Sequence, residues 1–232
     1  MLGTTLLLYR DAMKEAGRGF GRSAMVWPLP LLILVALKLV WFPLSLLGAV
    51  NLGILGGLIH FVLETLLYGA YLFLVGEALS SRRRLGLADI RDSLGRNMRE
   101  LIGLLFVFWI LQIALVVAEN NGQISAQVRL ATLLGVAILF NPGPEIVHQE
   151  RSVGSMDILV RAFRWMSSNA PEWLPNLVIT AGLVYALDGS RDSWFLLLVC
   201  GLVLHPWMLF RGALYRSLGE GSRRTREWRS RF

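Results

Sequence analysis

The feature that most constrains this chain is an apolar stretch that begins at Met25 and hardly pauses before Leu79. A helix needs about 20 mostly apolar residues to cross a hydrocarbon layer about 30 Å thick, so the stretch is too long for one crossing. Its middle, residues 48–53, holds two glycines and an asparagine but no charge, which predicts a tight turn. We therefore expect two membrane-spanning helices, at 25–47 and 54–79.

The composition of the whole chain also indicates a membrane protein. Of its 232 residues, 55% are hydrophobic and only 17% are charged, whereas soluble domains carry about 25% charged residues. The apolar runs are continuous and do not alternate with a period of two, which favours helices over the strands of a membrane barrel. A single cysteine, Cys200, excludes an internal disulfide framework and a cysteine-based zinc cluster.

Four further apolar segments complete the predicted topology. Turn-forming residues separate them within each pair, and they lie at 101–118, 124–140, 173–187 and 194–215. Pro142 and Pro144 lack backbone donors and therefore predict the end of the fourth segment. The expected fold class is all-α, a polytopic membrane protein with six transmembrane helices arranged as three hairpins.

The basic residues predict the orientation of these helices. Of the 23 lysines and arginines, 20 fall in the N-terminal segment, the two long connections and the C-terminal end. Arg191 alone falls on the opposite side, and Lys38 and Arg129 lie inside predicted spans. Because basic residues accumulate in cytoplasmic loops, we expect a multi-pass membrane protein with both termini in the cytoplasm.

Each long cytoplasmic connection carries an amphipathic pattern. Apolar residues recur at helical spacing in 6–16, 85–98 and 156–166, which predicts interfacial helices that do not cross the membrane. The expected segments are an amphipathic N-terminal segment at 1–24, a first hairpin at 25–79, a basic connector with the second hairpin at 80–140, a turn, amphipathic helix and third hairpin at 141–218, and a basic cytoplasmic tail at 219–232.

Two basic clusters predict contact with the membrane surface. A basic residue near anionic lipid headgroups gains about 1 kcal/mol, and the tail directly follows a membrane helix. We therefore favour lipid headgroups over nucleic acid as its partner and expect no nucleic-acid binding. The expected headgroup ligands are Arg82, Arg83, Arg84, Arg223, Arg224 and Arg226.

The last predicted span ends in Phe210-Arg211-Gly-Ala-Leu214-Tyr215-Arg216-Ser-Leu218. With six spans and amphipathic cytoplasmic connections, this ending resembles uncharacterised six-helix bacterial membrane-protein families. One of these is the membrane domain attached to some glycerophosphodiester phosphodiesterases. The resemblance implies the architecture and a bacterial origin, and therefore a place in the bacterial inner membrane. Because no phosphodiesterase segment accompanies it here, it implies no catalytic residue.

Lys38 and Glu64 are the deepest charged residues of the first predicted hairpin. They lie equally far from the turn near residue 51, so we expect either a structural ion pair or a proton or substrate site. His60 lies one helical turn before Glu64 on the same face. We expect no metal, because a structural site needs about four ligands and the sequence offers no further cluster.

Polar residues at matched depths recur in the other two predicted hairpins. Gln112 matches Arg129 in depth, and Asn176 matches His205. Each pair predicts an interhelical hydrogen bond, which in membranes is worth about 0.6–1.7 kcal/mol.

The string Asn141-Pro142-Gly143-Pro144-Glu145 predicts a stiff turn at the cytoplasmic surface. Glu145 can then pair with an arginine of a connector helix. Both a plain helix stop and a rigid acidic turn that docks a partner fit this pattern.

No catalytic motif accompanies these features. An enzyme needs a nucleophile with a base, a metal cluster or paired carboxylates within reach, and only His60 and Glu64 come close. We predict a non-catalytic protein without a cofactor, a subunit or scaffold of a larger membrane assembly. It would dock protein partners or further copies of itself through its basic cytoplasmic face. The alternative is a small-solute, ion or lipid transporter or channel subunit that uses Lys38, Glu64 and His60.

Overall fold

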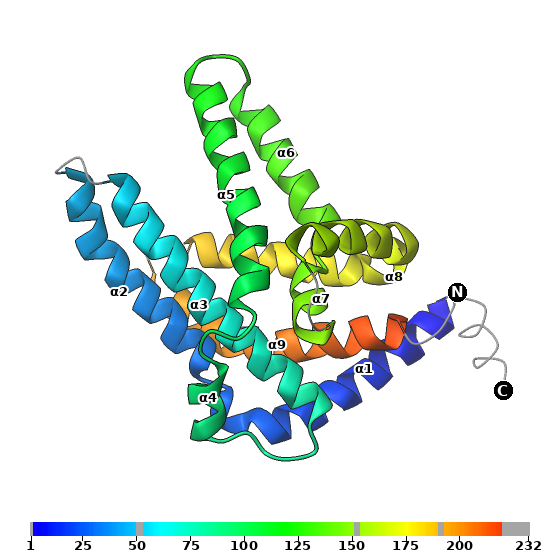
Figure 1. The fold of residues 1–232 in the computed structure, drawn as a ribbon. Helices are drawn as coiled ribbons and strands as arrows, with labels where there is room; N and C mark the ends of the chain where they lie inside the picture. Colours follow the sequence, from blue (N-terminus) through cyan, green and yellow to red (C-terminus); the bar gives the residue numbers. More distant parts are fainter. Residues whose placement is uncertain (1, 50–52, 151–153, 190–192, 220–232) are drawn as a thin grey trace.

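The structure is a computed structural model that describes residues 2–49, 53–150, 154–189 and 193–219. Helices account for most of these residues and no strand occurs among them, which confirms the all-α prediction (Figure 1). In chain order the elements are α1 (Leu2–Ser23), the short 3-10 helix η1 (Ala24–Val26), α2 (Leu29–Ala49), α3 (Gly53–Ser80), α4 (Leu87–Ser93), α5 (Met98–Asn120), α6 (Ala126–Leu139), α7 (Gly143–Gln149), α8 (Ser155–Gly189) and α9 (Trp194–Gly219).

Within the described ranges, four helices are long and apolar enough to cross a membrane. They are α3 from Gly56 onward, α5, α9, and α6 taken together with α7. A fifth crossing results if the segments Thr5–Val26 and Leu29–Val40, which meet at a bend of 51°, form one broken span. The fifth predicted segment, 173–187, lies in the second half of α8. Glu172, Pro175 and Asn176 reduce the apolar character of that half, and it does not belong to this set of helices.

The helix α6 is too short to cross a membrane alone. Its 14 residues extend about 21 Å, whereas the hydrocarbon layer is about 30 Å thick. It ends at Leu139 with Phe140 as its C-cap, directly before the prolines, so the predicted helix stop is present. The chain resumes a helical path in α7, with Pro142 as the N-cap, and this second piece supplies the missing length.

The helices α1 and α9 lie side by side in opposite directions and form the most extensive helix pair of the structure (Figure 1). The buried residues of α1 recur three or four positions apart, at Ala12, Ala16, Gly19 and Ser23. This spacing places them on one face of the helix. This face of small residues packs against the protein, whereas Leu6 and Met13 of the predicted amphipathic segment are exposed.

The other two amphipathic segments differ from the prediction. Only Leu87–Ser93 of the segment 85–98 forms a helix, α4. The chain then passes through two left-handed conformations, at Gly95 (φ 80°) and Asn97 (φ 56°), before α5 begins. Glycine and asparagine adopt this conformation more readily than other residues, which explains where α4 ends.

The segments 156–166 and 173–187, predicted as separate helices, are joined in α8. Pro171 and Pro175 lie inside this helix without ending it. One continuous stripe of buried residues, three or four positions apart, runs through the expected junction, at Ile158, Ala162, Met166, Asn169, Trp173 and Asn176. Packing along a single face therefore holds the two parts as one helix.

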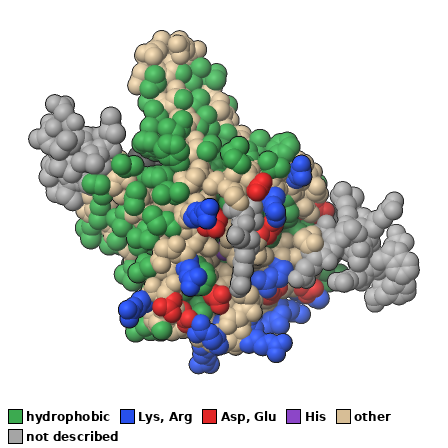
Figure 2. Space-filling view, in the orientation of Figure 1, with side chains coloured by type: hydrophobic (Ala, Val, Ile, Leu, Met, Phe, Trp, Pro, Cys, Tyr) green, Lys and Arg blue, Asp and Glu red, His purple; other side chains and the backbone are tan. Residues whose placement is uncertain are grey.

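Apolar and charged side chains gather on different parts of the surface. The α5–α6 hairpin extends away from the rest of the molecule, and its surface is largely apolar (Figures 1 and 2). Only 11% of the most apolar part of α5 is buried, against 50% for α9. Lysine, arginine and acidic side chains gather at the opposite end, as Figure 2 shows. This division is typical of a protein that exposes its apolar part to lipid.

Close helix packing depends on small residues at particular crossings. A Cβ atom added at Gly201 of α9 would lie 2.7 Å from the Cα atom of Leu31 in α2. A Cβ atom at Gly76 of α3 would lie 2.7 Å from the carbonyl oxygen of His148 in α7. Glycine at these positions lets the backbones approach closely, as is common between membrane helices.

We predict that Gly201→Ala destabilises the protein by about 1–3 kcal/mol, because the new methyl group meets backbone rather than a flexible side chain. Gly57→Ala is the matched control, since a Cβ atom there has nothing within 4 Å. Alanine at that helical position is expected to be neutral or to stabilise the protein by up to about 1 kcal/mol. Thermal unfolding in detergent measures both. Equal unfolding midpoints for the two variants would contradict the tight α2–α9 contact.

Candidate functional site: a buried ion pair between three helices

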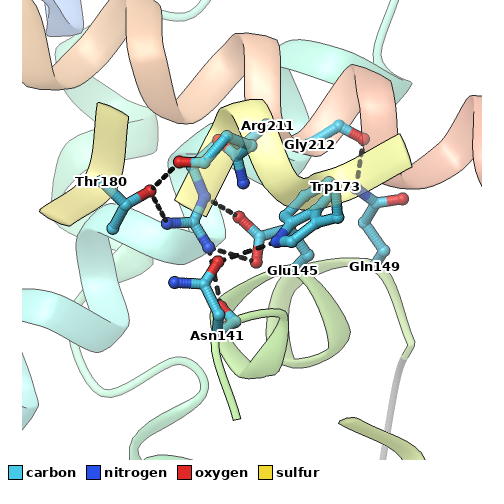
Figure 3. A network of polar contacts seen from close by, with 8 residues as sticks. Asn141, Glu145, Gln149, Trp173, Thr180, Arg211 and Gly212 are labelled. Carbon is cyan, nitrogen blue, oxygen red and sulfur yellow. Dashed lines mark hydrogen bonds and ion pairs between the residues drawn. The ribbon is translucent and has the colours of Figure 1, made fainter. Parts of the chain in front are cut away.

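The most buried charges of the described chain are Arg211 in α9 and Glu145 in α7. Their side chains are 5% and 0% exposed. Nε of Arg211 donates to Oε1 of Glu145 at 2.6 Å, and Nη2 donates to Oε2 at 2.8 Å (Figure 3). Two parallel bonds of this kind form the strong, geometrically specific pairing of a guanidinium with a carboxylate.

The remaining donors of Arg211 are also used. Nη2 donates to the carbonyl oxygen of Asn141 at 2.7 Å, and Nη1 donates to the hydroxyl oxygen of Thr180 in α8 at 3.2 Å (Figure 3). The guanidinium thus places four of its five N–H groups on acceptors from three segments of the chain. The indole nitrogen of Trp173 donates to the side-chain oxygen of Asn141 at 2.9 Å and closes the network.

The string Asn141–Glu145, predicted as a surface turn that pairs with a connector arginine, lies inside the protein instead. Pro142, Gly143 and Glu145 are buried, and Glu145 pairs with Arg211 of the last helix. Pro144 lies in the first turn of α7, where a missing backbone donor is tolerated. Arg211, which the sequence grouped with the cytoplasmic charges, is therefore a core residue.

A buried ion pair of this kind fixes the arrangement of helices. Both side chains are almost completely buried, so each charge depends on the other and on the polar groups nearby. The backbone next to the pair is fixed too, because Nε2 of Gln149 donates to the carbonyl oxygen of Gly212 at 2.7 Å. Together these contacts hold α7 and α8 in one position against α9.

We predict that Arg211→Met destabilises the protein by about 3–5 kcal/mol, because it leaves the Glu145 carboxylate buried without its partner. The double variant Arg211→Met, Glu145→Met is expected to regain most of that loss, since it removes both charges. Unfolding in detergent provides the free energies of the double-mutant cycle.

The exposed pair of Arg10 and Asp11, 3.4 Å apart, is the control. Arg10→Ala is expected to change stability by about 1 kcal/mol or less. If the double variant lost the sum of the two single losses, Arg211 and Glu145 would be independent of each other.

A second buried cluster joins α1, α3 and α9 through His205. Nε2 of His205 lies 2.9 Å from the hydroxyl oxygen of Ser23, and Nδ1 lies 3.2 Å from the hydroxyl oxygen of Tyr71. Ser23 gives its only proton to the carbonyl oxygen of Gly19, so it accepts from Nε2–H of His205. Nδ1 of the neutral imidazole then accepts from Tyr71. Ser23 and His205 are both 0% exposed, and their contact joins the end of α1 to α9.

The predicted bond between Asn176 and His205 is not formed. Asn176 is 0% exposed, and neither polar atom of its side chain has a hydrogen-bond partner among the described residues. His205 instead bonds to residues of α1 and α3, which are distant in sequence.

The residues of the first predicted hairpin do not form one site. The ammonium group of Lys38 lies 4.4 Å from the centre of the Trp194 ring in α9, a cation–π contact. Nδ1 of His60 lies 3.8 Å from Oε2 of Glu64, as their spacing predicts, and the Glu64 side chain is 52% exposed. No ion pair joins Lys38 to Glu64 in the described structure.

The second predicted pair also separates. Arg129 of α6 pairs with Glu119 of α5, with Nε and Oε2 2.5 Å apart, and this contact links the two helices near their turn. Gln112 lies on the exposed surface of α5 and forms no hydrogen bond with any described residue.

Sequence reasoning missed the polar contacts at the charged end of α9. The hydroxyl group of Tyr215 donates to Oε1 of Glu150 at 2.7 Å, and Arg161 pairs with the same carboxylate. Nη1 of Arg216 donates to Oε1 of Glu15 in α1 at 2.9 Å. Tyr215 and Arg216 both belong to the motif that ends the last predicted span, so the dense polar content of that motif was the available signal.

Among the predicted headgroup ligands, Arg82, Arg83 and Arg84 are exposed. Arg223, Arg224 and Arg226 lie outside the described residues. Arg83 forms two hydrogen bonds with Asp89 of α4, at 2.5 and 3.0 Å, and the backbone N–H of Gly86 donates to Asp89 at 2.8 Å. The guanidinium of Arg83, followed by that backbone donor, lowers the pKa of the Asp89 carboxyl.

We predict that acidification loosens α4. The folded pKa of Asp89 is lowered, so its stabilising effect is present above the ordinary carboxyl pKa, near 3.9, and is lost as the pH falls through the folded value. Hydrogen-exchange protection of the α4 amides, corrected for the intrinsic exchange rate, should fall over that range. Asp89→Asn should show weakened protection already at neutral pH. Protection that changes with pH equally in both proteins would contradict this role.

The described residues contain no group of three or more His, Cys, Asp or Glu side chains that could hold a metal ion. The region around Arg211 and Glu145 is buried, and its hydrogen bonds join α7, α8 and α9. Comparison with known proteins gives no match of this chain to a family model, a curated protein or a solved structure.

Proposed function

We propose that this chain is a non-catalytic protein of the bacterial inner membrane, a subunit or scaffold of a larger membrane assembly. It crosses the membrane six times as three hairpins and keeps both termini in the cytoplasm. Among the described residues four helices, or five with the broken span, are long and apolar enough to cross a membrane, which supports membrane insertion. The gathering of charged side chains at one end of the surface supports a common side for the long connections and the termini.

The observation that carries this proposal is the use of buried charge inside the protein. Arg211 and Glu145 form hydrogen bonds with each other, and Arg211 also bonds to neighbouring segments of the chain. A catalytic or transport site needs polar groups that face a substrate, whereas these face packed side chains. Such a network suits a rigid membrane body that holds its surfaces in fixed positions for partners.

The transport alternative loses support from the same geometry. It relied on Lys38, His60 and Glu64 as one polar site, but Lys38 lies against Trp194 and only His60 lies next to Glu64. A polar path along the first hairpin would need these groups together.

The docking surface proposed for cytoplasmic partners is the charged end of the molecule near Arg82 and Arg84, here called the basic end. Arg82 and Arg84 precede α4, are exposed, and carry positive charge without an acidic partner among the described ion pairs. A protein with an acidic surface complements this end, and electrostatic attraction speeds the encounter between them.

We predict that Arg82→Glu with Arg84→Glu removes the partner that co-purifies with the protein from native membranes in mild detergent. Quantitative mass spectrometry should show a loss of at least about tenfold, because attraction becomes repulsion at two exposed positions. Arg82→Lys with Arg84→Lys keeps the charges and is the matched control.

Both double variants should insert into the membrane and unfold at the temperature of the parent protein. A protein that purifies without any stoichiometric partner would overturn the proposed scaffold role. The same conclusion would follow if partners bound equally well to both double variants.

A further inference from the structure

Gln112 is a polar residue on the exposed surface of an apolar helix. It lies in α5, eight residues before Asn120, where that helix ends. At about 1.5 Å per residue this is about 12 Å inside the helix end, which is well within a hydrocarbon layer about 30 Å thick. Its amide is exposed, and no described residue bonds to it.

An amide in this position needs a partner that lipid tails cannot provide. Hydrocarbon offers neither a donor nor an acceptor, so an unpaired amide is unfavourable there. Glutamine side chains in membranes commonly satisfy this need by hydrogen bonding across helices. The partner of Gln112 must therefore come from a second membrane-embedded helix that the described chain does not supply.

The surroundings of Gln112 identify that helix as one from a second copy of this chain. A glutamine amide carries both donors and an acceptor, so in two copies related by a twofold axis each amide can donate an N–H to the carbonyl oxygen of the other. Between residues 101 and 139 the sequence has only two charges, Glu119 and Arg129, and these pair with each other. Two α5–α6 hairpins can therefore meet without repulsion, whereas the basic ends of two copies would repel.

We propose that two copies of this chain pair through the α5 face that carries Gln112, with each Gln112 bonded to Gln112 of the other copy. This inference rests on the membrane insertion assumed in the proposed function, and it names one partner of the assembly. The face includes Val116, one helical turn further along and 37% exposed. Val107, 40% exposed, lies nine residues before Val116 and thus on the opposite face of α5.

Disulfide crosslinking in native membranes tests the pairing. Cys200 is the only cysteine and is buried, so Cys200→Ser gives a background without thiols. In that background Val116→Cys should form a covalent dimer on mild oxidation, because equivalent residues of parallel copies lie at the same depth. Val107→Cys, equally exposed on the other face, should remain monomeric.

Gln112→Leu supplies a second measurement. It should lower the association constant of the dimer in lipid vesicles by about threefold to tenfold. Single-molecule photobleaching, which counts the dimer fraction, measures this constant. The thermal unfolding of the monomer should not change, because Gln112 bonds to no polar group in the part of the chain that the structure describes. Gln112→Asn, which keeps the amide, should retain more of the association than Gln112→Leu.

Equal crosslinking at Val116 and Val107, no crosslinking at either, or an unchanged dimer fraction in Gln112→Leu would each overturn this proposal. The result is separable from the scaffold role. A monomer that still co-purifies its partner through Arg82 and Arg84 disproves the pairing alone. A dimer without any further partner disproves only the scaffold role.

Discussion

The bidentate bond between Arg211 and Glu145 determines how the second half of the chain is assembled. A guanidinium removed from water needs a carboxylate and further acceptors, and Arg211 takes them from α7, from α8 and from the loop before α7. Each acceptor must lie within about 3 Å of a rigid, planar group. The relative positions of three helices are thereby fixed more strictly than apolar packing alone would fix them, because apolar contacts tolerate small shifts.

The helix α9 extends this principle along its length. His205 bonds to α1 and α3, and Arg211 bonds to α7 and α8. Further along the helix, Tyr215 bonds to Glu150, which follows α7, and Arg216 bonds to α1. Every residue from Met208 to Tyr215 is buried. This one helix therefore forms polar contacts with several different neighbouring helices. Gly201 lets the backbone of α2 approach this helix, and Gly212 leaves room for the side chains of Leu79 and His148.

The fold could be predicted from the sequence more completely than the polar contacts. Long apolar runs and the proline break after α6 located most of the helices, because the length of an apolar segment is a local property of the sequence. The predicted break between 156–166 and 173–187 was wrong, since α8 runs through both segments. The pairing of polar residues was predicted by equal depth within a hairpin, and this rule failed for Asn176 and His205. It failed because depth restricts only one of three dimensions. His205 has neighbours from α1 and α3 at the same level, and only the packed structure shows which of them it meets.

Glu145 illustrates the same limit and also a remedy. The two prolines that end α6 leave carbonyl groups of the chain without a helical partner, as at every helix end. The carbonyl of Asn141 is such a group, and Arg211 donates to it at 2.7 Å while also binding Glu145. A broken span and a distant arginine are thus parts of one solution, since a break inside a membrane protein requires donors from elsewhere. The sequence signal for the pair is therefore the coincidence of a proline break, a nearby carboxylate and one arginine inside an apolar helix.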